Sequence, residues 1–142
     1  LYNRNNILHV EYSTCLTDCQ KQTVLLNTNT GRPLRFDDIF APASASTIIT
    51  MANQALQAEI RDTLVKVSRE ERDIVTSAVK NKRFEHSDLD SLIVSEEGVT
   101  FGIKFDFEGG LRGLEPKGAY LFKFEQIKPY LRKDGLLGSH AQ

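Results

Sequence analysis

The fold is decided by the stretch LIVSEEGVTFGIKFDF at residues 92–107. From Val99 to Phe107 its residues alternate between large apolar side chains and small or polar ones. A period of two is typical of a strand with one buried face and one solvated face. Gly98, just before this strand, tolerates the positive φ of a tight loop. The stretch therefore predicts a hairpin in which residues 92–95 pair with residues 99–107.

The apolar face of this hairpin needs a cover, because each large apolar side chain gains roughly 1.5–3 kcal/mol on burial. Residues 48–64 place apolar side chains at steps of three and four, which indicates an amphipathic helix. Ser68 and Glu71 have the spacing of a capping box, which predicts a second helix over residues 69–81. We expect these two consecutive helices to cover the hairpin.

Further β-forming segments occur at residues 6–13, 21–28 and 119–124. Together with the hairpin they predict an α+β fold, in which one antiparallel sheet of about five strands is covered on one face by the two helices. We expect one domain over residues 1–133. Residues 134–142 contain two glycines and few apolar residues, which predicts a flexible tail.

Composition limits the classes of function. The chain has 142 residues and a formal net charge of −1, whereas nucleic-acid binders usually carry a basic excess. It contains no apolar run long enough to span a membrane. Because it opens at Leu1 without a methionine, we expect a processed product or a domain cut from a longer protein.

The cysteines Cys15 and Cys19 lie close together in a polar stretch. They could close a small disulfide ring, which would persist in an oxidising compartment. The alternative is two reduced thiols that do not pair. Composition alone does not decide between these states.

Candidate catalytic groups are weak. His9, Cys15 and Cys19 lack the second pair of ligands that zinc sites show, and strand alternation predicts that His9 faces solvent. The adjacent carboxylates Asp37 and Asp38 could belong to a hydrolase, yet neighbouring side chains on one element point apart. We expect no enzyme, metal or cofactor here.

The run YSTCLTDCQKQTVLLNTNTGRPLRFDDIF, residues 12–40, resembles the start of a known domain. This domain forms the extracytoplasmic carboxyl end of RsiV, a membrane-anchored, lysozyme-sensing anti-sigma factor of bacteria, and is similar to an accessory region of peptidoglycan deacetylases. Residues 120–130 weakly resemble the family's ending. The resemblance implies an extracytoplasmic, non-catalytic binding or sensing domain of a cell-envelope or secreted protein.

The resemblance implies a cell-wall glycan or a lysozyme-like protein as the ligand. For its binding surface we select the glycine-rich loop, because leucines and an arginine are plausible anchors in a loop; the residues are Gly110, Leu111, Arg112, Gly113 and Leu114. The alternatives are a cell-wall hydrolase that uses acidic residues, and a structural domain of a larger extracellular protein.

Overall fold

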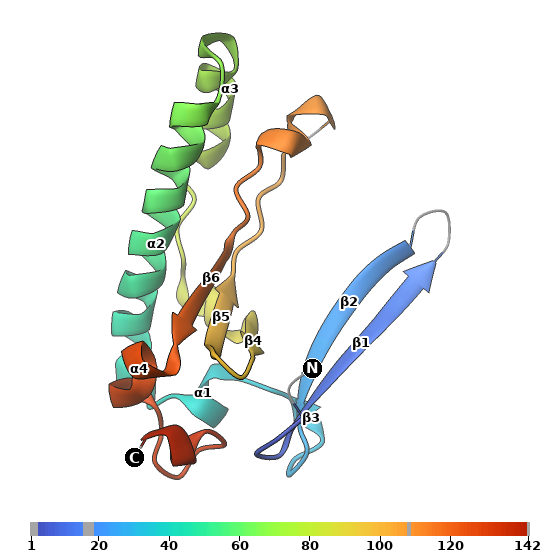
Figure 1. Ribbon diagram of the computed structural model, residues 1–142, viewed down its shortest axis with the longest axis vertical. Coiled ribbons are helices and arrows are strands. Elements are labelled where there is room, and N and C mark those ends of the chain that lie inside the picture. The colour runs from blue at the N-terminus through green and yellow to red at the C-terminus, as the bar shows by residue number, and fades with distance from the viewer. Residues whose placement is uncertain (1–2, 16–18, 108, 142) are drawn as a thin grey trace.

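The computed structural model describes residues 3–15, 19–107 and 109–141. Its strands are β1 (Ile7–Cys15), β2 (Cys19–Asn27), β3 (Arg32–Pro33), β4 (Leu92–Val94), β5 (Gly98–Gly102) and β6 (Ala119–Lys123). Its α-helices are α1 (Phe36–Ile39), α2 (Ala45–Lys66), α3 (Arg69–Val79) and α4 (Phe124–Ile127). Short 3₁₀ helices η1 to η5 lie at Pro42–Ser44, His86–Asp90, Gly109–Leu114, Lys128–Tyr130 and Gly138–Ala141. The α+β class with antiparallel strands is confirmed (Figure 1).

The strands form two sheets of three strands each, so the prediction of one five-stranded sheet is wrong. We call β1-β2-β3 the ribbon sheet and β4-β5-β6 the body sheet. The ribbon ends at β3, which pairs with β2 over two residues and includes Pro33, a residue with no amide hydrogen to donate. The chain then turns into α1. Figure 1 shows β1 and β2 projecting away from the body sheet.

The hairpin of residues 92–107 is confirmed at its turn end and is shorter than predicted. Leu92 lies opposite Phe101, and Val94 lies opposite Val99. Beyond Gly102 burial still alternates, because Phe105 and Phe107 are buried while Lys104 and Asp106 are exposed, but the ladder stops. The facing segment contains Pro116, which cannot donate a ladder hydrogen bond.

Both predicted long helices are present, but they do not together cover a sheet face. In Figure 1, α2 runs beside the body sheet and α3 turns back along the far half of α2. The core joins α2 to the body sheet through residues with at most 1% exposure: Ile48, Ala52, Leu56, Val94, Val99 and Phe101. Within the described ranges, no helix is both long and apolar enough to cross a bilayer.

Strand β1 buries the face opposite to the one its sequence favours. Leu8 and Tyr12 are 39% and 43% exposed, whereas Ile7 is buried and the His9 side chain is 10% exposed. The prediction that His9 faces solvent is therefore wrong. Both faces of β1 carry apolar residues, and packing of the ribbon base against the body selects the face of Ile7 and His9.

The end of the chain packs on the body, contrary to the predicted flexible tail at residues 134–142. Leu137 has no exposed surface, and the amide of Leu136 donates to the carbonyl of Asp38 at 3.0 Å. The ring of His140 stacks on Phe124 with centroids 4.0 Å apart. A buried leucine, a stacked histidine and backbone hydrogen bonds thus anchor a segment whose composition predicts flexibility.

The capping box of α3 makes a testable contribution to stability. The hydroxyl and amide of Ser68 donate to the Glu71 carboxylate, and these hydrogen bonds hold the pKa of Glu71 below its ordinary 4.5. A lowered pKa stabilises the folded protein above pH 4.5, and this contribution is lost as the pH falls through the folded-state value.

We therefore expect Glu71→Gln to lower the melting temperature at pH 7, with the difference from the wild type shrinking below pH 4.5. Thermal denaturation from pH 7 to pH 3 measures this. Glu70→Gln is the matched control, because Glu70 lies in the same first turn and makes no hydrogen bond to Ser68 in the described structure. A pH-independent difference for Glu71→Gln would contradict the assignment.

Candidate functional site

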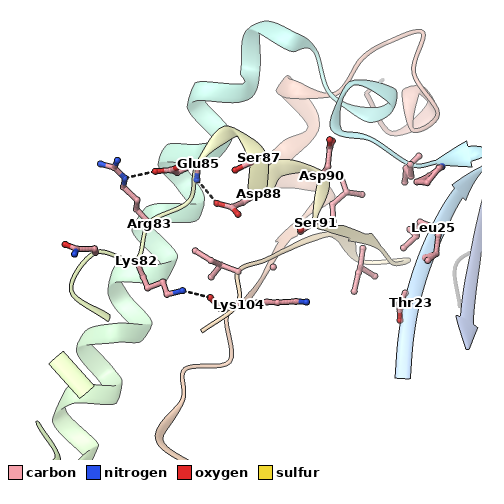
Figure 2. Close-up of a pocket in the computed structure, with 18 residues that line it drawn as sticks. Thr23, Leu25, Lys82, Arg83, Glu85, Ser87, Asp88, Asp90, Ser91 and Lys104 are labelled. Atoms are coloured by element: carbon pink, nitrogen blue, oxygen red, sulfur yellow. Dashed lines mark hydrogen bonds and ion pairs between the residues drawn. The ribbon is translucent and has the colours of Figure 1, made fainter. Parts of the chain in front are cut away.

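A cleft of about 960 Å³ lies between the ribbon sheet and the body. We call it the inter-sheet cleft. Its ribbon wall consists of residues from β2 and the β3 region: Thr23, Val24, Leu25, Pro33 and Leu34. Its body wall consists of Asn81, Lys82, Arg83, Glu85, Ser87, Asp88, Asp90, Ser91, Leu92, Ile93, Gly102, Ile103 and Lys104. Figure 2 shows Thr23 and Leu25 on one side and the η2 and β4 segments on the other.

The ribbon wall exposes part of a strand edge. The carbonyl of Leu25 accepts a hydrogen bond from the amide of Leu34 at 2.7 Å. This bond lies where the chain after β3 separates from β2. Along an antiparallel strand, backbone groups of alternate residues point to the same edge. The backbone of Thr23 therefore points to the same side as that of Leu25, and no β3 residue lies beside it.

Most charged groups of the body wall are engaged within the protein. The Lys82 ammonium donates to the Lys104 carbonyl at 3.0 Å and lies 3.4 Å from an Asp106 carboxylate oxygen. Arg83 pairs with Glu85 at 3.1 Å. These contacts hold the rim of the cleft together.

Two further carboxylates of the wall act as caps for backbone amides. Asp88 accepts from the amide of Glu85 at 2.8 Å, at the start of η2. Asp90 accepts from the amide of Phe36 at 2.8 Å, and so joins η2 to α1. Each of these two carboxylates thus uses one oxygen to hold a backbone amide.

Lys104 differs from the other charged groups of the cleft. Its ammonium has no hydrogen-bond or ion-pair partner among the residues that the structure describes. Figure 2 shows its side chain extending across the cleft toward Thr23. The same wall includes Ile93, which is 42% exposed, and Ile103, which is half-buried. The body wall thus offers one cation next to an apolar surface.

The body wall is held on α2 by a pair of reciprocal hydrogen bonds. The Asn53 side chain donates to the carbonyl of Phe84 at 3.1 Å and accepts from its amide at 2.8 Å. Phe84 is buried and its ring packs edge-on against Tyr120. The segment that carries Lys82 and Arg83 therefore has a fixed position relative to the helix.

The predicted binding residues lie elsewhere, in η3 at the far end of the molecule (Figure 1). Leu111 and Leu114 are half-buried and pack against the core, whereas Arg112 and Gly113 are exposed. Gly110 also belongs to η3, and its burial lies outside what the structure describes. Gly113 and Leu114 line a second cavity of about 660 Å³ against α2.

Glu59 fixes the loop beside this second cavity. Its carboxylate accepts from the amides of Lys117 and Gly118 at 2.7 and 3.2 Å, and from the Tyr120 hydroxyl at 2.6 Å. Burial and the hydrogen bond to this carboxylate raise the pKa of Tyr120 well above its usual range, so the phenol stays protonated and keeps donating. Gly118 has φ +63°, a conformation that favours glycine.

The carboxylates considered for a hydrolase have structural roles or point away. Asp38 accepts from the Arg35 amide at 2.8 Å and from the Asn27 side chain at 3.0 Å, which engages both of its oxygens. Asp37 is exposed and lines neither large cavity. Among the described residues, no group of three or more His, Cys, Asp or Glu side chains could hold a metal ion.

Cys15 and Cys19 lie directly opposite each other where β1 and β2 meet. Opposed residues of antiparallel strands have Cα atoms about 4.5–5.5 Å apart, within the range that a disulfide bridges. The two strands thus extend beyond the β-forming segments predicted at residues 6–13 and 21–28, and residues 16–18 between them lie outside the described residues. The disulfide itself stays a prediction.

Sequence reasoning missed the residues that face the cleft, notably Thr23 and Lys104. Lys104 lies on the polar face of the predicted strand, where a lysine is ordinary. Nothing in the sequence distinguishes Thr23 from the other residues of its strand. The nearest signal in the sequence is Pro33, which marks the end of strand pairing six residues after Asn27 and so limits how much of β2 can be covered.

Comparisons with known proteins give no relative: no family model, no curated protein and no solved structure matches this chain.

The packing of η3 predicts a cost for removing its leucines. Half-buried leucines contribute less than the 2–5 kcal/mol of fully buried ones, so we expect Leu111→Ala with Leu114→Ala to destabilise by about 2 kcal/mol and lower the melting temperature by about 5 °C. Calorimetry measures this, with the exposed Arg112→Ala as the control that leaves stability nearly unchanged. An unchanged melting temperature for the double variant would instead favour the leucines as free anchors for a ligand.

Proposed function

We propose that this chain is a non-catalytic binding or sensing domain of a bacterial cell-envelope or secreted protein, and that its ligand occupies the inter-sheet cleft. The observation that carries the proposal is the state of the polar groups in the cleft. Its carboxylates cap or pair within the protein, while Lys104 and the backbone edge at Thr23 face the cavity without a partner among the described residues. Uncommitted groups beside an apolar wall are typical of a recognition site.

The arrangement supports binding over hydrolysis. General acid–base catalysis needs two groups that converge on one reacting bond. In the cleft, Glu85 pairs with Arg83, and Asp88 and Asp90 accept backbone amides. The structural roles of these three carboxylates account for their positions. We therefore infer that the cleft binds a ligand and does not cleave it.

The resemblance of residues 12–40 to the RsiV-type domain supports a ligand of the cell envelope, either a cell-wall component or a lysozyme-like protein. The stretch spans β2, β3 and α1, and these elements set the ribbon wall of the cleft. The part of the chain that carries the resemblance is therefore also the part that shapes the proposed site.

The opposition of Cys15 and Cys19 supports an oxidising compartment, because a disulfide is stable there and is reduced in the cytoplasm. We expect protein from its native compartment to have an intact mass lower by two hydrogens than the reduced form, with no alkylation before reduction. Mass spectrometry with and without reductant measures this. Two thiols that alkylate freely would contradict the proposed location.

The binding proposal is tested by obstructing the cleft. Ser91 is exposed and lines it, so the indole of Ser91→Trp should block part of the cleft, and Ser77→Trp on the exposed surface of α3 is the matched control. We titrate ¹⁵N-labelled protein with hen-type lysozyme and with soluble peptidoglycan fragments. We expect shift changes centred on Thr23, Ile93 and Lys104, with affinity reduced at least about tenfold by Ser91→Trp and unchanged by Ser77→Trp.

Two outcomes of this titration would overturn the assignment. Binding that ignores Ser91→Trp and is lost with Arg112→Ala would move the site to η3 and the second cavity. Cleavage of the peptidoglycan fragments during the titration would establish the competing hydrolase.

A further inference from the structure

We propose that the inter-sheet cleft takes an extended peptide segment, which adds as a strand to the open edge of β2 and places an acidic side chain against Lys104. This inference rests on the proposed function and names the class of its ligand. It follows from the state of the β2 edge, from the shape of the opposite wall and from the charge at Lys104.

The first step concerns the edge of β2. The amide of Thr28 donates to the carbonyl of Asn6, which sets the alternation of hydrogen-bonded pairs along the ribbon. With the observed register, Leu8 with Leu26 and Val10 with Val24 exchange hydrogen bonds, while the backbone groups of Thr23 point away from β1. The amide and carbonyl of Thr23 therefore face the cleft as a free donor and acceptor.

The second step is that this edge lacks the usual protection against strand addition. Natural edge strands are blunted by proline, charged side chains or bulges. The pairing of β2 with β1 runs residue for residue from Asn27 to Cys19 without a bulge. The residues from Gln22 to Leu25 are uncharged, and the one charged residue in the β2 sequence is Lys21, two positions before Thr23. A regular, open edge of this kind offers main-chain hydrogen bonds to an extended chain.

The third step concerns the opposite wall. Side chains of an added strand alternate between its two faces, so every second residue would point across the cleft at the body wall. The lining of this wall includes the apolar residues Ile93 and Ile103 and the ammonium of Lys104. The wall therefore selects a peptide with an apolar residue and an acidic residue two positions apart.

The edge can be blocked without damaging the ribbon. Thr23→Pro removes a backbone donor that faces the cleft, and the ladder to β1 does not use this donor. Glu11 lies directly opposite Thr23 in the register, so its backbone faces the other edge of the ribbon. Glu11→Pro is thus a matched control that places the same ring on the same ladder, away from the cleft.

The test selects random peptides of about eight residues, displayed and screened against the full chain. We expect selected peptides with an acidic and an apolar residue two positions apart. Their affinity should fall about tenfold with Thr23→Pro, as one lost backbone hydrogen bond predicts, and should be retained by Glu11→Pro. N-methylation of the peptide amides of one parity should abolish binding, while methylation of the other parity should not. Lys104→Gln should weaken binding and reduce its dependence on salt.

Three results separate the inference from the proposed function. If lysozyme or peptidoglycan fragments bind in the cleft, but Thr23→Pro and N-methylation have no effect, strand addition is wrong and the proposed function stands. If neither those probes nor any selected peptide binds in a manner sensitive to Ser91→Trp, both fail. Circular dichroism of Thr23→Pro and Glu11→Pro checks that each variant retains the ribbon.

Discussion

The junction between the ribbon and the body is centred on one hydrogen bond, from the buried Asn27 side chain to the Asp38 carboxylate at 3.0 Å. Asn27 ends β2, and its own oxygens accept from the amides of Asn29, Thr30 and Gly31, so it also builds the turn to β3. Through its second carboxylate oxygen and its carbonyl, Asp38 holds Arg35 and Leu136. Leaving the buried Asn27 amide without this partner would cost the folded protein roughly 1–3 kcal/mol of stability. This cost favours a single geometry at the junction.

The inter-sheet cleft is a consequence of this junction together with the short β3 strand. If β3 were longer, it would cover β2, and the ribbon would carry no free edge. If the ribbon were not held at Asn27, it would lack a fixed distance from the body wall. The open space in the molecule is therefore maintained by the same contacts that keep its two sheets apart, and recognition at the cleft requires no separate scaffold.

Local features of the fold were predictable from sequence, because each depends on a pattern within one segment. The alternation after Val99 and the Ser68–Glu71 capping box both identified elements that the structure contains. The relation between segments was not predictable. Leu8 and Tyr12 present as good an apolar face as Ile7, and tertiary packing chose between them. The candidate site was missed for the same reason: Thr23 and Lys104 are 81 positions apart, and they meet only because the ribbon and the body line the same cleft.

Glu59, through the hydrogen bonds that its carboxylate accepts, affects the order in which parts of the chain fold. Its hydrogen bonds join residues 58, 59 and 61 positions apart, whereas α2 forms from neighbours along its own sequence. Contacts of long sequence separation require the closure of a large loop, and such closure is slow relative to helix formation. We therefore expect α2 to exist before the segment around Gly118 attaches to it. The segments on either side of η3 then pack late in folding, against a helix on which the Glu59 carboxylate is already positioned to accept their hydrogen bonds.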